Sequence, residues 1–418
     1  MKIKVLHIVG GPTTNGAYKG TIILHKALLK LNIESKLLND TPPKNYQKNL
    51  ENTDKTIIFI NNNFFTKIIN KIYIFLEKIL KSIYLSSSRS TFTLGYLGFD
   101  ITKIKEYKDA DIIHIHWLNQ GFIRLKSLSK IDKPVVWTMR DMWAFTGGSH
   151  YSMDFEKYET TYLSRKIKNF KKKIYKKNFQ FIAISDWLKN EAQKSFVLKD
   201  HNIKRIYNNI DLKNFNIIDQ NKSQSILNIS TKKQIILYGA QNPQAKRKGW
   251  QIFIETLKKL DTSKYYLLIF GKFWSQKTLD EIGIEYKSLG FIDDKKILNT
   301  IYSSADFFIA SSIQEAFGKT WAEAMACGTP IICFKNTPAS EIIDHKINGY
   351  IVDNYNSDEL LIGINWLSNE IKGNENKKDL TRNKIINFDA EIIAKKYVDL
   401  YGSIFPNKKN IINVKKII

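Results

Sequence analysis

The run that decides the fold is Ala305-Asp-Phe-Phe-Ile-Ala-Ser-Ser-Ile-Gln-Glu315-Ala-Phe-Gly318-Lys-Thr-Trp-Ala-Glu323-Ala-Met-Ala-Cys-Gly-Thr-Pro330. A short apolar strand opens it, a helix of small residues from Ala322 to Cys327 follows, and a second apolar strand comes after it. Strands that alternate with helices in this way predict a parallel sheet in an α/β fold. Because Gly318 disfavours a helix through both acids, we expect Glu315 in the loop and Glu323 inside the helix.

The two acids suit a ligand that carries sugars. At about 1.5 Å of rise per residue, Glu323 lies roughly 7 Å along the helix axis from the amides near Gly318. Free amides and the positive end of the helix dipole therefore face the mouth of the sheet, flanked by two separated carboxylates. Each carboxylate oxygen accepts a hydroxyl hydrogen. A nucleotide-sugar, with its ribose and its transferred hexose, fits this spacing.

This run resembles the E-x7-E signature of retaining glycosyltransferases of the large bacterial family 4-like group, which uses the two-domain GT-B fold. The flanking S-S-x-x-E-x-F-G and E-A-M-A-C-G-T-P segments strengthen the resemblance. It implies that Glu323 binds the ribose of the donor, and that Glu315, Phe317 and Gly318 contact the donor sugar. The alternative is a pair of surface acids that flank a helix start.

A basic loop forms the second part of the resemblance. Residues 240–250 read Ala-Gln-Asn-Pro-Gln-Ala-Lys-Arg-Lys-Gly-Trp, between an apolar strand and a helix. In the resembled family this loop holds the donor diphosphate through an Arg and a Lys-Gly pair, which Lys248 and Gly249 match. Ala240 stands where the family has the Arg, so Arg247 or Lys246 is the candidate replacement. Fixed cations stabilise the charge on a departing diphosphate; the alternative is a solvated basic loop.

Two series of apolar strands indicate two domains. The first lies near 3–9, 56–60, 112–115, 134–138 and 179–184, and the second near 234–238, 265–270, 306–310 and 330–334. We expect an α/β chain of two Rossmann-like domains facing across a cleft, which is the GT-B arrangement. The first expected domain, residues 1–206, binds the acceptor. The second, residues 207–386, binds the nucleotide-sugar. Residues 387–418 form a tail whose helix, near 390–401, crosses back to the first domain, and the polar stretch 214–233 reads as a linker and loop.

The acceptor side is read from two runs that follow strands. Asp111-Ile-Ile-His-Ile-His116-Trp117 ends one strand, and residues 134–151 follow the next. The second run is similar to the H-D-M-W-x-F-T-G-G-C-H-Y of a branch that builds exopolysaccharides and capsules, with Arg140 in place of the His and Ser149 in place of the Cys. The resemblance makes these residues acceptor-binding candidates: His116, Trp117, Arg140, Trp143 and His150. Arg140 could instead bind an acidic acceptor or a phosphate, and Trp137, Trp143 and Phe145 could simply fill core.

The expected mechanism needs little side-chain chemistry. By resemblance, the acceptor hydroxyl attacks on the face from which the diphosphate departs, and a phosphate oxygen takes the proton. Glu315 and Lys248 then act through positioning and charge. Asp141 as a general base is the competing idea. Gly11 and Gly16, in the turn after the first strand, resemble the family's glycine-rich loop, where small residues let a helix N-terminus approach the donor; a plain turn is the alternative.

Composition narrows the partners. The net charge of +25 attracts anions, for which nucleotide diphosphates, anionic lipids and nucleic acid are candidates. No nucleic-acid motif is present, so nucleic acid is not an expected partner. We expect no cofactor and no metal: His114 and His116 share one strand face, but the sequence shows no third ligand. We expect Cys327 and Cys333 to be small buried hydrophobic residues. Because the sequence shows no signal peptide, the chain is expected in the cytoplasm.

A basic amphipathic helix is predicted over residues 64–84. Its apolar residues recur at helical spacing, with lysines elsewhere on the turn. Such a helix could lie on an anionic membrane that holds a lipid-linked acceptor, and the basic run 165–177 could widen that surface. The bland alternative is a helix that covers the first sheet.

The resemblance to this family implies a retaining, metal-independent glycosyltransferase. It would move a hexose from a nucleotide-diphosphate sugar, most simply a UDP-sugar, to a surface polysaccharide or lipid-linked saccharide. A peripheral location on the inner face of the cell membrane would suit such an acceptor. The rivals are a nucleotide-sugar hydrolase or epimerase on the same fold, and a non-catalytic partner protein that binds a sugar-nucleotide.

Overall fold

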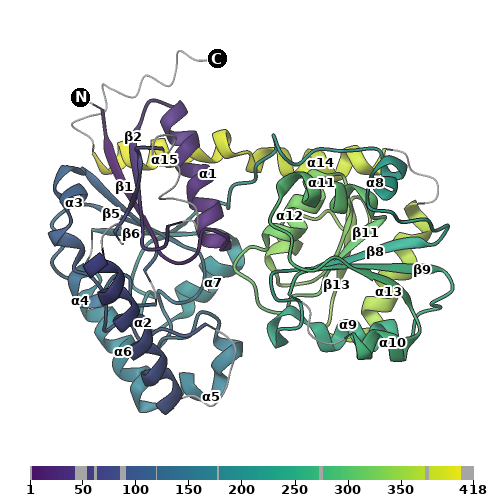
Figure 1. Ribbon diagram of the computed structural model, residues 1–418, viewed down its shortest axis with the longest axis horizontal. Coiled ribbons are helices and arrows are strands. Elements are labelled where there is room, and N and C mark those ends of the chain that lie inside the picture. The colour runs from purple at the N-terminus through teal and green to yellow at the C-terminus, as the bar shows by residue number, and fades with distance from the viewer. Residues whose placement is uncertain are drawn as a thin grey trace. The chain divides into compact units, whose positions relative to one another are not determined.

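The computed structural model describes residues 2–42, 54–60, 64–84, 91–118, 120–176, 178–272, 276–371 and 376–405. They form two compact units (Figure 1). Unit 1 is Met1–Asn209 together with Ala390–Ile418, and unit 2 is Ile210–Asp389. Each unit has its own parallel sheet and its own apolar core, as the two strand series predict.

Unit 1 is built on a seven-stranded sheet of order β3-β2-β1-β4-β5-β6-β7. Every pairing in it is parallel. The order reverses between β1 and β4, and ligands of doubly wound sheets bind beyond the carboxyl ends of the strands at such a reversal. The strands are β1 Lys4–Val9, β2 Glu34–Asn39, β3 Ile57–Phe59, β4 Ile112–Trp117, β5 Val135–Met139, β6 Phe179–Ala183 and β7 Ile203–Arg205.

The last helix of the chain belongs to unit 1. It packs beside α1 (Figure 1), and apolar side chains of both helices meet those of β1 and β4 in one core. The helices of this unit are α1 Gly16–Lys30, α2 Phe64–Tyr84, α3 Lys105–Asp109, α4 Leu125–Leu128, α5 Glu156–Glu159, α6 Tyr162–Ile174, α7 Asp186–Lys194 and α15 Ala390–Ile404, with 3-10 turns at Ile101–Lys103 and Ser152–Phe155.

Unit 2 repeats this architecture with six parallel strands in the order β10-β9-β8-β11-β12-β13. The strands are β8 Gln234–Gly239, β9 Tyr265–Phe270, β10 Glu285–Ser288, β11 Phe307–Ala310, β12 Ile331–Phe334 and β13 Gly349–Val352. The helices are α8 Gln220–Ile226, α9 Trp250–Leu257, α10 Lys277–Ile282, α11 Lys295–Ser304, α12 Lys319–Ala326, α13 Ser357–Ile371 and α14 Lys377–Ile385, with 3-10 turns at Lys246–Lys248, Pro338–Glu341 and Ile386–Phe388.

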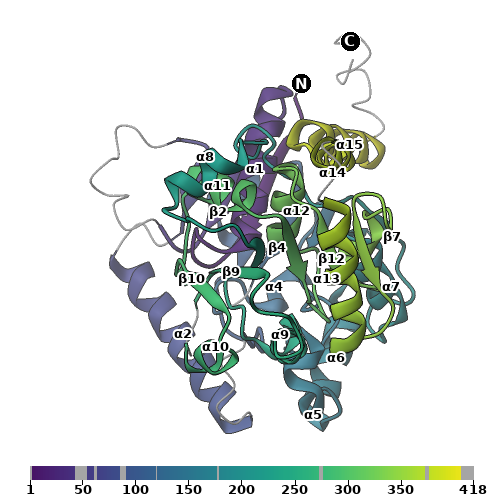
Figure 2. The same cartoon turned by 90° about the vertical axis from the view of Figure 1, so that its right-hand side faces the viewer.

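The stretch 214–233 is not a linker. It contains α8, which packs against α11 inside unit 2 (Figures 1 and 2). The Asn216 amide donates to Asn299 Oδ1 at 3.0 Å, and Asn299 Nδ2 returns a bond to Asn216 Oδ1 at 2.9 Å. The polar residues that suggested a loop are therefore the hydrogen-bonding partners of a neighbouring helix.

Helix α2 turns its apolar face outward. Its two most deeply buried described side chains are polar, since Asn70 and Glu77 are each 5% exposed. Glu77 accepts hydrogen bonds from the Leu94 and Gly95 amides at 3.0 and 3.2 Å, which fixes the helix to a neighbouring loop. Eight apolar side chains are 38–76% exposed: Phe64, Phe65, Ile68, Ile69, Ile72, Phe75, Leu76 and Ile79. The alternative that α2 covers the sheet with this face is therefore wrong.

The second basic run is only partly a surface feature. Helix α6 carries it, but Lys171 is fully buried and so cannot contribute to a surface patch. Lys177 lies outside the described residues. In the part of the chain that the structure describes, no helix is long and apolar enough to cross a membrane.

Candidate active site

A pocket of unit 2 lies beyond the carboxyl ends of β8 and β11, where the strand order reverses. Side chains and backbone from the strand ends, the basic loop and the start of α12 line it: Tyr238, Gly239, Ala240, Lys248, Phe308, Ile309, Ala310, Ser311, Ser312, Glu315, Gly318, Thr320 and Trp321. The two sequence motifs thus meet in one place. Ala240, the departure from the resembled family, also lies on this wall.

Two cations of the basic loop are paired with the first acid of the E-x7-E run. Lys248 Nζ forms a hydrogen-bonded ion pair with Glu315 Oε2, and Arg247 NH1 lies 3.5 Å from the same oxygen. All three side chains are mostly shielded from solvent, with 12–18% of each exposed. A partly desolvated group of two cations and one anion has an excess positive charge, which suits a ligand with phosphate groups.

Backbone contacts hold these two loops against each other. The Arg247 carbonyl accepts from the Ile313 and Gln314 amides at 2.8 and 3.2 Å. The Lys248 carbonyl accepts from Ser311 Oγ at 2.8 Å and from Tyr238 Oη at 3.2 Å. Gly249 follows at a φ of +69°, and a Cβ there would lie 1.9 Å from the Ser311 carbonyl oxygen. Glycine is therefore required for the loop to approach β11 this closely.

Helix α12 starts where the sequence predicts. Gly318 is its N-cap residue, with a φ of +91°, so Glu315 lies in the loop and Glu323 lies within the helix. A Cβ on Gly318 would meet Trp321 Nε1 at 2.0 Å. The Phe317 ring is buried against Trp321 and Phe388, and Phe317 is not among the residues that line the pocket.

Glu323 is held by a residue that sequence reasoning missed. Tyr302, fully buried on α11, donates its hydroxyl to Glu323 Oε2 at 2.9 Å. Lys319 Nζ lies 3.9 Å from the other carboxylate oxygen, one turn earlier on the same helix. Burial, with the charge of Glu323 beside it, raises the pKa of Tyr302 well above its usual value, so the phenol stays a donor. Glu323 itself is not among the residues that line the pocket.

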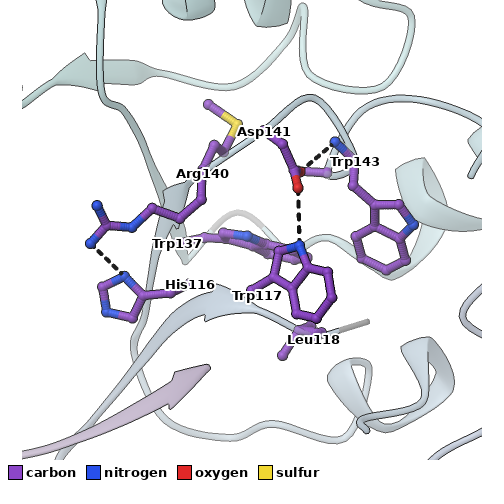
Figure 3. A pocket seen from close by; sticks show the side chains of 9 residues that line it. His116, Trp117, Leu118, Trp137, Arg140, Asp141 and Trp143 are labelled. Atoms are coloured by element: carbon purple, nitrogen blue, oxygen red, sulfur yellow. Dashed lines mark hydrogen bonds between the residues drawn. The ribbon is translucent and has the colours of Figure 1, made fainter. Parts of the chain in front are cut away.

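A second pocket, in unit 1, lies at the carboxyl ends of β4 and β5 (Figure 3). It gathers most of the predicted acceptor residues, and its lining is His116, Trp117, Leu118, Trp137, Met139, Arg140, Asp141, Trp143 and Ala144. Trp137 and Trp143 are each 2% exposed, so these rings belong to the core as well as to the pocket wall. Phe145 is buried in the same way.

Asp141 is the anchor of this pocket's aromatic wall. Its carboxylate accepts from Trp117 Nε1 at 3.0 Å, from His150 Nδ1 at 2.6 Å and from the Trp143 amide at 2.9 Å. Burial alone would raise the pKa of Asp141, but His150 and these hydrogen bonds hold it below its usual value. A carboxylate with a lowered pKa and three donors is a weak proton acceptor, so the geometry favours positioning over general-base catalysis.

His116 and Arg140 belong to a buried histidine cluster. Arg140 NH2 lies 3.3 Å from His116 Nδ1, and His116 Nε2 lies 2.9 Å from His7 Nδ1. His114 is bonded through both ring nitrogens, to Tyr401 Oη at 2.6 Å and to Thr138 Oγ1 at 2.8 Å. Burial, together with the neighbouring positive charges, lowers the pKa of all three histidines well below the usual value.

His7 is the third histidine of this cluster, and the sequence did not reveal it. The ligand nitrogens of His7, His114 and His116 lie within 4.8 Å of one another, close enough to be considered as a metal site. The Arg140 guanidinium beside them repels a cation, and His114 has committed both nitrogens to hydroxyl groups. Knowledge that β1 pairs with β4 would have revealed the cluster, because His7 is directly opposite His114 in the register.

The glycine-rich turn is also part of unit 1. Gly11 has a φ of +83°, its amide donates to Asp40 Oδ1 at 2.7 Å, and a Cβ there would meet the Trp117 ring at 2.8 Å. Gly16 begins α1, and a Cβ there would meet nothing within 4 Å. The turn thus requires glycine at Gly11, beside the aromatic pocket, and not at Gly16.

Family models match both halves of the chain. The model described as "Glycosyltransferase Family 4" matches residues 69–214, and the model described as "Glycosyl transferases group 1" matches residues 219–385. An uncharacterised glycosyltransferase of Methanocaldococcus jannaschii is 29% identical over 74% of this chain and 77% of its own length. An uncharacterised protein of the cps region of Klebsiella pneumoniae is 23% identical over 77% and 87%.

A relative with a named activity is more distant. The N,N'-diacetylbacillosaminyl-diphospho-undecaprenol alpha-1,3-N-acetylgalactosaminyltransferase of Campylobacter jejuni is 25% identical over 56% of this chain and 64% of its own. Among solved structures, sucrose-phosphate synthase of Thermosynechococcus elongatus superposes with a TM-score of 0.71 at 16% identity, covering 97% of this chain and 100% of its own. Anabaena HepE, solved with UDP and glucose, superposes with a TM-score of 0.63 at 17% identity, covering 96% and 100%.

Proposed function

We propose that this chain, which belongs to the GT-B glycosyltransferases of the group 1 and family 4 type, transfers a hexose from a nucleotide-diphosphate sugar to a saccharide with retention of configuration. The observation that carries the proposal is the meeting of Lys248, Arg247 and Glu315 at the carboxyl ends of β8 and β11. UDP is the proposed nucleotide, and Anabaena HepE, whose structure contains UDP and glucose, lends it support.

Each residue of the donor site has a proposed role that follows from its chemistry. Lys248 and Arg247 neutralise the departing diphosphate, so that protein cations supply the charge that a metal would otherwise supply. Glu315 and the Gly318 amide orient the donor sugar, and Glu323, oriented by Tyr302, binds the ribose. The acceptor hydroxyl attacks on the face from which the diphosphate leaves, and a phosphate oxygen takes its proton. The lowered pKa of Asp141 agrees with a mechanism that uses no side-chain base.

Nucleotide-dependent stabilisation tests the donor site. Thermal unfolding is followed with UDP, GDP, ADP or CMP, in the wild type and in Glu323→Ala and Lys248→Ala. A nucleotide at about 100 times its Kd adds about 2.7 kcal/mol to the free energy of unfolding. We expect a shift with one nucleotide only, reduced in both variants. Product formation with an acceptor, lost in Glu315→Ala, then separates transfer from hydrolysis, epimerisation or simple binding. The absence of a thermal shift with all four nucleotides would contradict the proposal.

We also propose that helix α2 lies on an anionic membrane, where a lipid-linked acceptor would be found. Its outward apolar face runs from Phe64 to Ile79, and Lys67, Lys71 and Lys78 lie beside that face. Glu77 and Asn70 are buried, and the hydrogen bonds of Glu77 to the Leu94 and Gly95 amides fix the orientation of the helix. A broad apolar face flanked by lysines is typical of helices that lie in a membrane interface.

Liposome sedimentation tests this orientation. Vesicles with and without anionic lipid are mixed with the wild type and with the double variant Phe65→Ser, Ile72→Ser. We expect binding that requires anionic lipid, weakens with salt, and is lost in the double variant. Phe196→Ser, which removes an exposed ring elsewhere in unit 1, is the matched control and should bind normally. Binding that ignores lipid charge and salt contradicts the proposal.

A further inference from the structure

Among the described residues, no carboxylate pairs with the cation of Arg140. Its described contacts are Asn208 Oδ1 through NH1 and His116 Nδ1 through NH2, and Nε is buried with no hydrogen-bond partner among the described residues. The neighbouring Asp141 carboxylate is directed away, toward Trp117 and the Trp143 amide (Figure 3). Arg140 is one of the residues that line the unit 1 pocket, and its described contacts do not compensate the charge of its guanidinium.

The hydrogen bonds behind Arg140 fix its orientation. Because Arg140 only donates, His116 Nδ1 must accept, which places the His116 proton on Nε2, where it is donated to His7 Nδ1. Histidines in this chain of bonds are neutral donors and acceptors, and none supplies a negative charge. Gly20 of α1 provides the space: a Cβ there would lie 2.7 Å from Arg140 NH1.

Such an arrangement is costly unless something uses the charge. An uncompensated charge at a mostly apolar site has lost part of its hydration, which is unfavourable. The same apolar surroundings strengthen the attraction between this charge and an incoming anion. The rest of the wall is largely aromatic and aliphatic, with Trp117, Trp137, Met139 and Trp143. The one carboxylate in this lining, Asp141, accepts hydrogen bonds from Trp117, His150 and the Trp143 amide. Burial lowers the pKa of Arg140 only to about 10, so the guanidinium is charged at neutral pH.

We propose that the unit 1 pocket binds an anionic group of a saccharide substrate, a carboxylate or a phosphate, through Arg140. The inference rests on the proposed function, because it names the class of saccharide that this glycosyltransferase takes. Arg140 forms a bidentate pair with the anion, as guanidinium groups do with carboxylates and phosphates.

Binding of three model saccharides tests the proposal without any nucleotide. Methyl glucuronide, glucose 1-phosphate and methyl glucoside are titrated by calorimetry into the full chain, with tryptophan fluorescence as a second readout. We expect at least one anionic saccharide to bind at least about tenfold tighter than the neutral glucoside. Preference for the glucuronide identifies a carboxylate ligand, and preference for glucose 1-phosphate identifies a phosphate ligand.

Four variants locate the effect. Arg140→Met should lose the preference for the anion, and Arg140→Lys should keep part of it. Arg165→Gln, which removes an exposed arginine of the same unit, controls for net charge, and Lys248→Met excludes binding of the phosphate in unit 2; both should keep the preference. If Arg140→Met does not fold, Arg140→His, with a neutral side chain at pH 8, serves in its place.

The outcomes separate this inference from the proposed function. Equal affinity for the charged and neutral sugars, or a preference that survives in Arg140→Met or Arg140→His, overturns it. Loss of nucleotide binding with an intact Arg140-dependent preference would contradict the proposed function alone. An intact nucleotide shift without any anion preference would contradict only this inference.

Discussion

Lys248 and Glu315, which are 67 residues apart in the chain, form an ion pair at the edge of the unit 2 sheet. The pair joins a loop that follows β8 to a loop that follows β11, and backbone bonds from Ile313 and Gln314 to Arg247 run beside it. The position of the ammonium group is therefore set by both loops. A cation held in this way is preorganised for a ligand with phosphate groups.

Replacing Lys248 should damage catalysis more than stability. We expect Lys248→Met to lower kcat by about 10²- to 10³-fold, because charge on the leaving diphosphate loses a fixed cation. Steady-state kinetics with the nucleotide-sugar identified by the thermal shifts would measure it. Lys258→Met, at an exposed position after α9, is the charge-matched control and should keep wild-type kcat. Equal kcat in Lys248→Met and Lys258→Met would remove Lys248 from the mechanism.

Tyr302 should act through Glu323. Tyr302→Phe removes the donor to a buried carboxylate, and a hydrogen bond to a charged group contributes about 1.5–3 kcal/mol. We expect that loss in the free energy of unfolding, measured with urea, and a higher Kd for the nucleotide. Tyr265→Phe removes a bond of similar length to Ser368 between neutral groups of the same unit. It should cost about 1 kcal/mol and leave the nucleotide Kd unchanged, and a Kd that rises equally in both variants would contradict the ribose role of Glu323.

Gly249 should be far less tolerant than another glycine with the same backbone. Gly249→Ala combines a left-handed φ with a Cβ that would lie 1.9 Å from the Ser311 carbonyl oxygen. Gly283 has a φ of +73° and nothing within 4 Å of the added Cβ, so Gly283→Ala shows the conformational cost alone, about 1–2 kcal/mol. We expect Gly249→Ala to lower Tm clearly more than Gly283→Ala and to abolish the nucleotide shift. Similar Tm values would show that the loop can move away from β11.

The sequence alone was sufficient to predict the features that depend on local patterns. The strand series and the start of α12 at Gly318 follow from apolar runs and one glycine, both of which are local. The outward face of α2 was not predictable in the same way, because helical periodicity shows that an apolar face exists but not what it contacts. The contacts that decide the matter are those of Glu77 with the Leu94 and Gly95 amides, which belong to a separate loop 17 and 18 residues along the chain.

The hidden parts of both sites depend on pairing between distant segments. His7 joins His114 only through the register of β1 and β4, and Tyr302 meets Glu323 only when α11 packs on α12. Neither residue stands in a motif. Helix α8 was missed for a related reason: Gln220 and Gln224 look like loop residues until their partner on α11, the Ser304 carbonyl, is known.

Lys171 should make stability depend on pH. The side chain is fully buried, its ammonium donates to the Trp143 and Thr146 carbonyls, and burial lowers its pKa to about 7. An unfolded lysine has a pKa of about 10.4. Between these values the unfolded chain binds more protons than the folded one, so the free energy of unfolding rises with pH, by about 1.36 kcal/mol per unit.

The test compares urea unfolding at pH 7 and pH 9. We expect the wild type to gain on the order of 2 kcal/mol relative to Lys171→Met over this interval, because the methionine variant lacks the titrating group. Lys173→Met, at an exposed position of the same helix, should follow the wild type. The same pH dependence in Lys171→Met and Lys173→Met would mean that Lys171 keeps an ordinary pKa in the folded protein. The loop that carries Trp143 would then be held by a fully charged lysine at both pH values.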